Sequence, residues 1–175
     1  IADYTFNYNA LGTAVKTTSV NYYGADMDRA AQADVEDAMS LTESFKYDMF
    51  TNSDTRLLSR TLYDTRLEKG SEIADYTLNY KTDGSTVRNT SYNWYSQTQV
   101  NNAGTPDDDT DDFEEVVLVR ASSAGDEDAL RKTETYKDNH EIVTTSKLQS
   151  ETYNHIGFGK GDEIADYTFN YNALG

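Results

Sequence analysis

Residues 1–12 read IADYTFNYNALG, and residues 164–175 repeat the same twelve letters without a change. A variant of this repeat motif, IADYTLNYKTDG, occupies residues 73–84. Identity over twelve positions is more than a shared preference for one secondary structure would produce, so 1–163 is one full period of the sequence. The chain then comprises that period and the start of the next, which is typical of one unit of a tandem array.

Apolar and polar side chains alternate along the repeat motif. Aromatic or aliphatic residues take every second position, and Asp, Thr and Asn stand between them. A period of two predicts a strand with one buried face. The structural positions of the three copies are Tyr4, Phe6, Tyr8, Tyr76, Leu78, Tyr80, Tyr167, Phe169 and Tyr171. We expect those of the first two copies to be buried, and Asp3, Asn7, Asp75 and Asn79 to face outward or to form polar ladders.

A glycine closes the motif and predicts a tight turn. Gly12 and Gly84 suit a hairpin, because glycine takes positive φ without a steric penalty. Segments rich in Thr, Val and Tyr follow and predict the returning strands. The motif is therefore the first arm of a β-hairpin. The full set of expected hairpins is 1–23, 42–71, 73–95 and 133–161.

The four hairpins form two corresponding pairs. The hairpin at 73–95 matches that at 1–23, and the start of the fourth, TETYK at 133–137, matches TESFK at 42–46. The link at 96–132 is longer than the link at 24–41, and this difference accounts for the unequal lengths of the two halves. A two-hairpin module has therefore duplicated, and one link has lengthened. The expected organisation is a first module at 1–72, a second module at 73–163 and the start of a third copy at 164–175.

The two links differ in their expected structure. Ala, Met, Gln and Glu recur at helical spacing in the first link, which predicts a short acidic helix within 24–41. The second link holds the apolar run VVLVR at 116–120, which predicts one additional strand. The expected fold is all-β, with tandem antiparallel β-hairpin repeats in a continuous sheet and one short helix in a link.

Composition limits the partners of the chain. The formal net charge is −16, which disfavours nucleic acid and anionic membrane surfaces and favours solubility and cation binding. There are 14 tyrosines and no cysteine, so aromatic cross-strand pairs are expected to hold a thin sheet without disulfides. No run of about 18 apolar residues predicts a membrane helix. The expected partners are neighbouring repeats of the same chain or other copies of it.

The acidic segment 107–115, DDDTDDFEE, is the candidate metal site. Asp107, Asp109 and Asp111 stand at alternating positions and could ligate Ca²⁺ through oxygen. The spacing does not follow the EF-hand, which needs a glycine at loop position six and a glutamate at position twelve. The alternative is a solvated acidic loop without metal, for which salt would stabilise the protein only generically. No other cofactor is expected.

The sequence offers no catalytic constellation. His140 and His155 are the only histidines, and neither has a partner at metal-ligand spacing. A nucleophile elbow and a phosphate-binding loop are both missing from the sequence. We therefore expect no enzymatic activity. One aromatic cluster fits either a sugar-binding platform or the packed face of a sheet. Its members are Tyr22, Tyr23, Tyr92, Trp94 and Tyr95.

Three hairpin starts share a pattern that begins with tyrosine and ends with a β-branched residue. They read YNALGTAV at 8–15, YKTDGSTV at 80–87 and YKDNHEIV at 136–143, and KYDMF at 46–50 contains a Tyr-Asp pair. This pattern resembles the YD repeats of Rhs-type proteins, although Thr13 and Ser85 replace the arginine usual after the glycine. The resemblance implies long curved sheets of consecutive hairpins, in some members shells around a toxin. It also implies a large secreted or surface protein of bacteria.

The sequence therefore favours a structural tandem repeat, one tile of a long extracellular fibre, filament or surface stalk. Two alternatives stay open: an adhesin repeat whose acidic links bind Ca²⁺ or another ligand, and a segment of an Rhs-like toxin-enclosing shell. Near-identical copies favour the fibre, because recent duplication under selection for length keeps tiles alike. The expected location is extracellular or on the bacterial cell surface.

Overall fold

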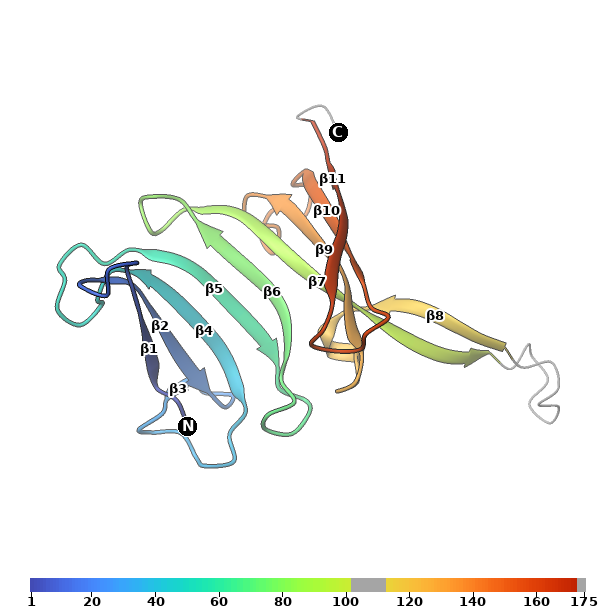
Figure 1. The fold of residues 1–175 in the computed structure, drawn as a ribbon, viewed down its shortest axis with the longest axis horizontal. Coiled ribbons are helices and arrows are strands. Elements are labelled where there is room, and N and C mark those ends of the chain that lie inside the picture. Colours follow the sequence, from blue (N-terminus) through green and yellow to red (C-terminus); the bar gives the residue numbers. More distant parts are fainter. Residues whose placement is uncertain (102–112, 173–175) are drawn as a thin grey trace.

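The computed structural model describes residues 1–101 and 113–172. Its strands form one antiparallel sheet in the order β1-β2-β4-β5-β6-β7-β9-β10-β11, with β3 added to β2 and β8 added to β7 (Figure 1). The first module contains β1 (Tyr4–Tyr8), β2 (Val15–Tyr23), β3 (Asp28–Arg29), β4 (Met39–Lys46) and β5 (Leu57–Asp64). The second module contains β6 (Ile73–Tyr80), β7 (Val87–Asn101), β8 (Phe113–Val119), β9 (Ala129–Lys137) and β10 (Leu148–His155). The third copy of the motif forms β11 (Ile164–Asn170).

The all-β fold predicted from the sequence is confirmed. The four predicted hairpins are present as β1–β2, β4–β5, β6–β7 and β9–β10, and the additional strand is β8. All three copies of the repeat motif form strands. Each hairpin pairs with the hairpin that precedes it, so the sheet grows in chain order.

The helix predicted within 24–41 is wrong. Gly24 and Met27 adopt positive φ values of 67° and 56°, and this turn brings β3 back to pair with β2. A short helix would bury little here, because its apolar side is mostly alanine, and isolated short helices are marginal. The only helical turn in the described residues is the 3-10 turn η1 (Ala121–Ser123), in the second link. No helix among the described residues is long and apolar enough to cross a membrane.

The additional residues of the second link have a defined place. In the first module β3 pairs Asp28 with Tyr23, and in the second module β8 pairs Val119 with Tyr95. These pairs are equivalent, because alignment of the two modules places Tyr95 on Tyr23 and Val119 on Asp28. The additional residues lengthen a tight turn into the β7–β8 ribbon, which projects from the sheet (Figure 1).

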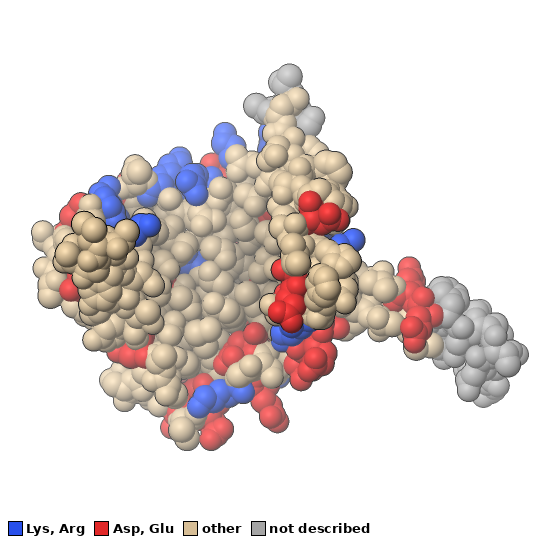
Figure 2. Space-filling model, in the orientation of Figure 1, with Lys and Arg blue, Asp and Glu red and all other residues tan. Residues whose placement is uncertain are grey.

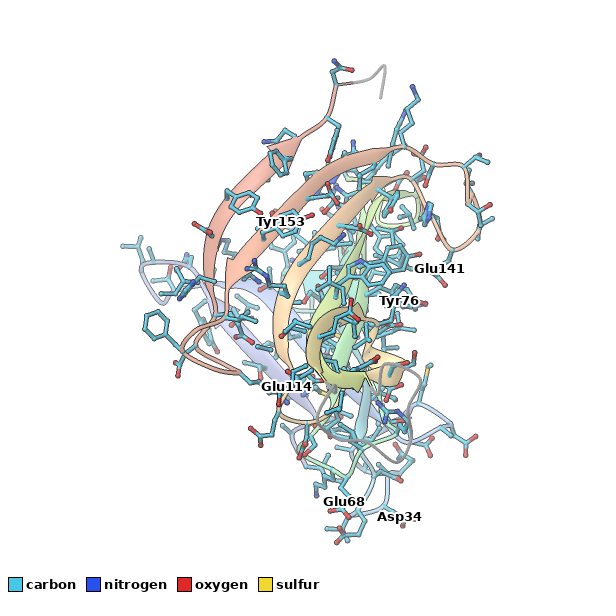
Figure 3. The ribbon with its side chains drawn as sticks, turned by 90° about the vertical axis from the view of Figure 1, so that its right-hand side faces the viewer. Asp34, Glu68, Tyr76, Glu114, Glu141 and Tyr153 are labelled. Atoms are coloured by element: carbon cyan, nitrogen blue, oxygen red, sulfur yellow. The ribbon has the colours of Figure 1, made fainter. Side chains whose placement is uncertain are left out.

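The two faces of the sheet differ in chemistry. One face, called the aromatic face, carries pairs such as Tyr76 opposite Tyr92, whose ring centroids are 5.7 Å apart. The other, called the polar face, carries ladders of Thr, Ser and Asn, such as Thr61 and Thr77 with hydroxyls 2.9 Å apart. Figure 2 views the polar face, which is hollowed and nearly free of charge in its middle. Figure 3 shows Tyr76 and Glu141 together on the aromatic side.

The buried core lies on the aromatic face and beneath the second link. Val20, Leu78 and Tyr92 are buried on the aromatic face, where the loop between β9 and β10 brings His140 edge-on against Tyr92. A second cluster forms where η1 covers β6 and β7. It consists of Ile73, Tyr95, Ala121 and Ala124, with Leu67, Val119 and Leu130 packed around it.

Burial of the repeat motif depends on its place in the sheet. In β6, which has a neighbour on both edges, Leu78 is 8% exposed and Tyr76 and Tyr80 are half-buried, in line with the prediction. For the first copy the prediction is wrong at Tyr4 and Tyr8, which are exposed because β1 has one neighbour. The other exposed structural positions are Tyr167, Phe169 and Tyr171, in and after β11. Phe6 is half-buried and packs near Phe50.

Only some of the predicted polar positions form ladders. Asn7 donates to Thr17 across the β1–β2 hairpin at 3.2 Å, as expected for a polar ladder. Asp3 and Asp75 are instead held by arginine side chains of the links, at 2.8 Å in each case. The aspartates of the motif therefore have a separate role from the other polar positions.

The two turn glycines give a matched test of the hairpin geometry. Both adopt positive φ, 68° at Gly12 and 71° at Gly84, but a Cβ at Gly84 would lie 3.0 Å from Arg56 Cβ, whereas none lies within 4 Å at Gly12. We expect Gly12→Ala to lower the free energy of unfolding by about 1 kcal/mol through backbone strain. Gly84→Ala should cost roughly 2–4 kcal/mol, because overpacking adds to the strain. Urea unfolding measures both, and equal losses would contradict the close approach at Gly84.

Candidate functional site: the joints between modules

Successive copies of the module meet at two strand joints, β5–β6 and β10–β11. Thr61 faces Thr77 in the first joint and Thr152 faces Thr168 in the second, and the other strand pairs correspond in the same alignment. Each register shifts at the same step, where one residue of the motif strand bulges out. The two joints are therefore one strand-pairing site that occurs twice.

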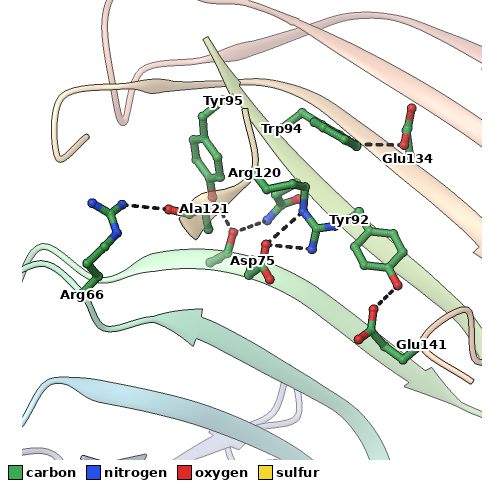
Figure 4. Close-up of polar contacts among 11 residues, drawn as sticks. Arg66, Asp75, Tyr92, Trp94, Tyr95, Arg120, Ala121, Glu134 and Glu141 are labelled. Atoms are coloured by element: carbon green, nitrogen blue, oxygen red, sulfur yellow. Dashed lines mark hydrogen bonds and ion pairs between the residues drawn. The ribbon is translucent and has the colours of Figure 1, made fainter. Parts of the chain in front are cut away.

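The aspartate of the motif binds an arginine of the following link. Arg120 donates two hydrogen bonds to Asp75, from Nε at 3.0 Å and from Nη2 at 2.8 Å (Figure 4). Arg29 donates two to Asp3, each at 2.8 Å. The hydrogen bond from Arg29 holds the pKa of Asp3 below its usual value. A bulge re-aims one side chain, and the bulge in β6 leaves Asp75 unpaired where it meets Arg120. In both modules the ion pair fastens the link to the start of the motif strand.

The second link also covers the start of β6. Ile73 is 3% exposed and packs against Ala121 and Tyr95. The Tyr95 hydroxyl donates to the Ala74 carbonyl oxygen at 2.6 Å, and burial raises the pKa of Tyr95 to about 12. Arg66 of the first module donates to the Ala121 carbonyl oxygen at 3.2 Å (Figure 4). The joint is thus closed by residues of both modules.

A glutamate before the motif fastens the joint from its other side. Glu72 accepts a hydrogen bond from the Met39 amide at 2.9 Å, and Glu163 accepts one from the Leu130 amide at the same distance. Burial opposes ionisation of Glu72, but hydrogen bonds from backbone amides, that of Met39 first, lower its pKa. The carboxylate therefore holds the start of the second hairpin of a module, at β4 or β9, to the residue just before the next motif strand.

The second module carries a cleft of about 320 Å³ on its aromatic face. The Arg120 guanidinium lies 4.2 Å from the Tyr92 ring centroid and 5.6 Å from that of Trp94. Trp94 donates to Glu134 at 2.9 Å, and Tyr92 donates to Glu141 (Figure 4). Burial, together with the bond to Glu141, raises the pKa of Tyr92. The carboxylates are hydrogen-bonded within the cleft, so the network stabilises the fold without a ligand.

This cleft is not repeated in the first module. At the equivalent positions the first module has apolar residues where the second has polar ones. Val20, Phe45, Met49 and Phe50 correspond to Tyr92, Tyr136, His140 and Glu141. The joint framework is therefore shared by both modules, whereas this surface differs between them. Of the aromatic cluster predicted from the sequence, Tyr23, Tyr92 and Tyr95 are buried, as expected for a packed face, and Tyr22 and Trp94 are half-buried.

The two histidines lie apart, His140 in the loop between β9 and β10 and His155 at the end of β10. His140 Nδ1 lies 2.5 Å from Ser146 Oγ, and the ring stacks on Tyr136 at 4.1 Å between centroids. Nucleophilic catalysis needs a third group that orients the base, and no carboxylate in the described part of the chain hydrogen-bonds to this ring. His155 is exposed at the end of β10, beside Phe158.

The predicted calcium ligands Asp107, Asp109 and Asp111 lie outside the described residues. Within the described parts, no group of three or more acidic or histidine side chains converges to hold a metal ion. Gly12 and Gly84 adopt the positive φ predicted for them.

The fastening residues were missed by the sequence reasoning. Arg29 is 26 positions from its aspartate and Arg120 is 45 from its own, so no fixed spacing links them to the motif. One feature of the sequence could have identified them. The two arginines occupy equivalent positions, because each stands at the same distance before the second hairpin of its module.

Comparisons with protein-family models, with curated proteins and with solved structures find no match to this chain.

The lowered pKa of Glu72 predicts a specific response to acid. Its folded pKa lies below its ordinary value of 4.5, so its stabilisation is complete above that value and is lost as pH falls through the folded pKa. Glu72→Gln keeps an acceptor oxygen for the Met39 amide but removes the titration. Urea unfolding between pH 6 and pH 3 should show that the free energy of unfolding falls less steeply with acid in the variant than in the parent protein. The difference between the two proteins should be about 1.4 kcal/mol for each unit by which the folded pKa is lowered. An equally steep loss in both proteins would contradict this role.

Proposed function

We propose that the chain is a non-enzymatic structural tile of a long tandem-repeat fibre, filament or stalk. The observation that carries this proposal is the repetition of the joint. β11 pairs with β10 in the register in which β6 pairs with β5, including the bulge. Because each module pairs with the next one in the same strand register, further modules can be added to the sheet without limit.

The buried surface of the motif supports a strand that is flanked on both edges. Ile73 at the start of β6 is 3% exposed, whereas the equivalent Ile1 and Ile164 are 48% and 58% exposed. The same letters are therefore a core segment in the middle of the sheet and an apolar surface at its ends. An exposed apolar edge strand is a template for further pairing.

The polar face supports an extended sheet rather than a packed sandwich. A second sheet needs an apolar inner face to pack against, and the polar face offers ladders such as Ser91 with Thr135, whose oxygens are 3.0 Å apart. Lateral stacking on that face is therefore disfavoured, and growth is directed along the order of the strands.

Two properties of the sequence support the proposed location and solubility of the fibre. The resemblance to YD-repeat proteins favours a secreted or surface protein of a bacterium. The net charge of −16 favours solubility of the protein. Neighbouring repeats of the same chain, or other copies, are the partners that this function requires.

Chains of one, two and three complete periods test the proposal. Because each added period buries two open ends at a joint, we expect the thermal midpoint to rise with period number and to level off, as in other repeat arrays. Electron microscopy of the native material should show regular filaments whose length follows the number of periods. Equal thermal midpoints would mean that each period folds independently of its neighbours, which would contradict the proposal. Closed shells in the micrographs would favour the toxin-enclosing alternative.

A further inference from the structure

The end of the sheet at β11 has an uncovered apolar hollow, as a comparison with the first joint shows. In that joint Leu67 packs beside Ile73 under the second link. The equivalent Phe158 and Ile164 are 66% and 58% exposed. They line an open hollow of about 600 Å³ together with Asp162 and Glu163. The hollow therefore lies where the first joint has Ala121 and Ala124.

The motif strand at this end also lacks the arginine of its joint. Asp166 is the bulge residue of β11, equivalent to Asp75 of β6. Asp75 is held by Arg120 at 2.8 Å, whereas Asp166 has no ion-pair partner among the described residues. The residue that would stand beside Asp166 as Arg120 stands beside Asp75 is Arg29 of another copy, and Ala30 would correspond to Ala121 in the same way.

We propose, on the basis of the proposed function, that this end of the sheet is the docking surface for the first hairpin and first link of a second copy of the chain. One motif strand lies between β10 of the first copy and β2 of the second. The first link of the second copy then fills the hollow over Ile164, with Ala30 in the place of Ala121 and Arg29 on the motif aspartate. The partner is specified by the sequence identity of β1 and β11.

This docking releases one strand. β1 and β11 belong to identical copies of the motif, so either can serve as the shared strand. The two ends that meet contribute one β10–β11 ladder from the first copy and one β1–β2 ladder from the second, and the docked pair keeps both ladders around a single shared strand. β11 thus acts as a cap that the first strand of another copy replaces in the same register. A chain with a weakened β11 should dock more readily than the parent chain.

The lack of cysteine allows a direct test of the register. The Tyr171 amide donates to the Gln149 carbonyl oxygen at 2.8 Å, and amides alternate along a strand, so the Phe169 amide also faces β10. Proline has no amide hydrogen to donate, so Phe169→Pro should weaken the pairing of β11 with β10. The residues of β11 are all exposed, so this substitution lies outside the buried core. In the docked pair Thr5 replaces Thr168 opposite Thr152, where the two threonine hydroxyls are now 3.0 Å apart.

Oxidation of a mixture gives the readout. The full chain with Thr152→Cys and Phe169→Pro, mixed with a Thr5→Cys chain, should form a disulfide-linked pair of twice the monomer mass. The matched control is Thr17→Cys in β2, which has neighbours on both edges and should give no pair. Absence of the Thr5 pair, or an equal yield from the control, would overturn the docking.

Sedimentation tests the hollow separately. The Phe169→Pro chain should associate with rising concentration, and adding Phe158→Lys should return it to the monomer. Val116→Lys is the control, because Val116 is 64% exposed on the β7–β8 ribbon, away from the joint. If Phe158→Lys left the association unchanged, the proposed docking of the link in the hollow would be wrong. If covalent chains of several periods gain stability while these separate copies do not pair, the proposed function stands and this inference fails.

Discussion

Pairing of the motif strand along both of its edges is the interaction on which the rest of the structure depends. The sheet is a single layer, so a strand cannot be buried by a second sheet above it. Its side chains are covered by the strands on either side and by the link that folds back over its start. Leu78 in β6 is 8% exposed and its counterpart Phe169 in β11 is 53% exposed, although both stand in the same motif. Position in the array, rather than sequence, decides which copy is core.

The bulge converts this general pairing into a specific joint. Strand pairing alone permits slippage, and a slip by one residue exchanges the two faces of a strand. Both joints nevertheless keep one register, in which Asp75 and Asp166 stand unpaired between paired neighbours. The ion pair of the motif aspartate with a link arginine recurs in both modules, Arg120 with Asp75 and Arg29 with Asp3. The insertion that precedes Arg120 leaves it intact, which marks the fastening as the part that each module retains.

Much of the fold could be predicted from the sequence, because periodicity acts locally. Alternation of apolar and polar residues identified the hairpins, and the equal length differences located the insertion in a link. The prediction of a helix within 24–41 failed because helical spacing of alanines was weighed without the turn at Gly24 and Met27. Exposure of Tyr4 and Tyr167 was also not predictable from the pattern alone, since β6 carries nearly the same motif and its Tyr76 is half-buried. The arginine fastenings are long-range contacts, which a periodic pattern does not encode.

Amide hydrogen exchange tests the two-edged strand most directly, because β1 and β11 have the same sequence and thus the same intrinsic exchange chemistry. The Asn21 amide donates to the Asp3 carbonyl oxygen, so odd-numbered residues of β1 face β2. The account predicts that amides of Thr5 and Asn7 are protected and those of Tyr4 and Phe6 exchange freely. In β11 the pattern should reverse, with Tyr167 and Phe169 protected and Thr168 and Asn170 free. In β6 both sets should be protected, and the same pattern of protection in all three copies would contradict the account.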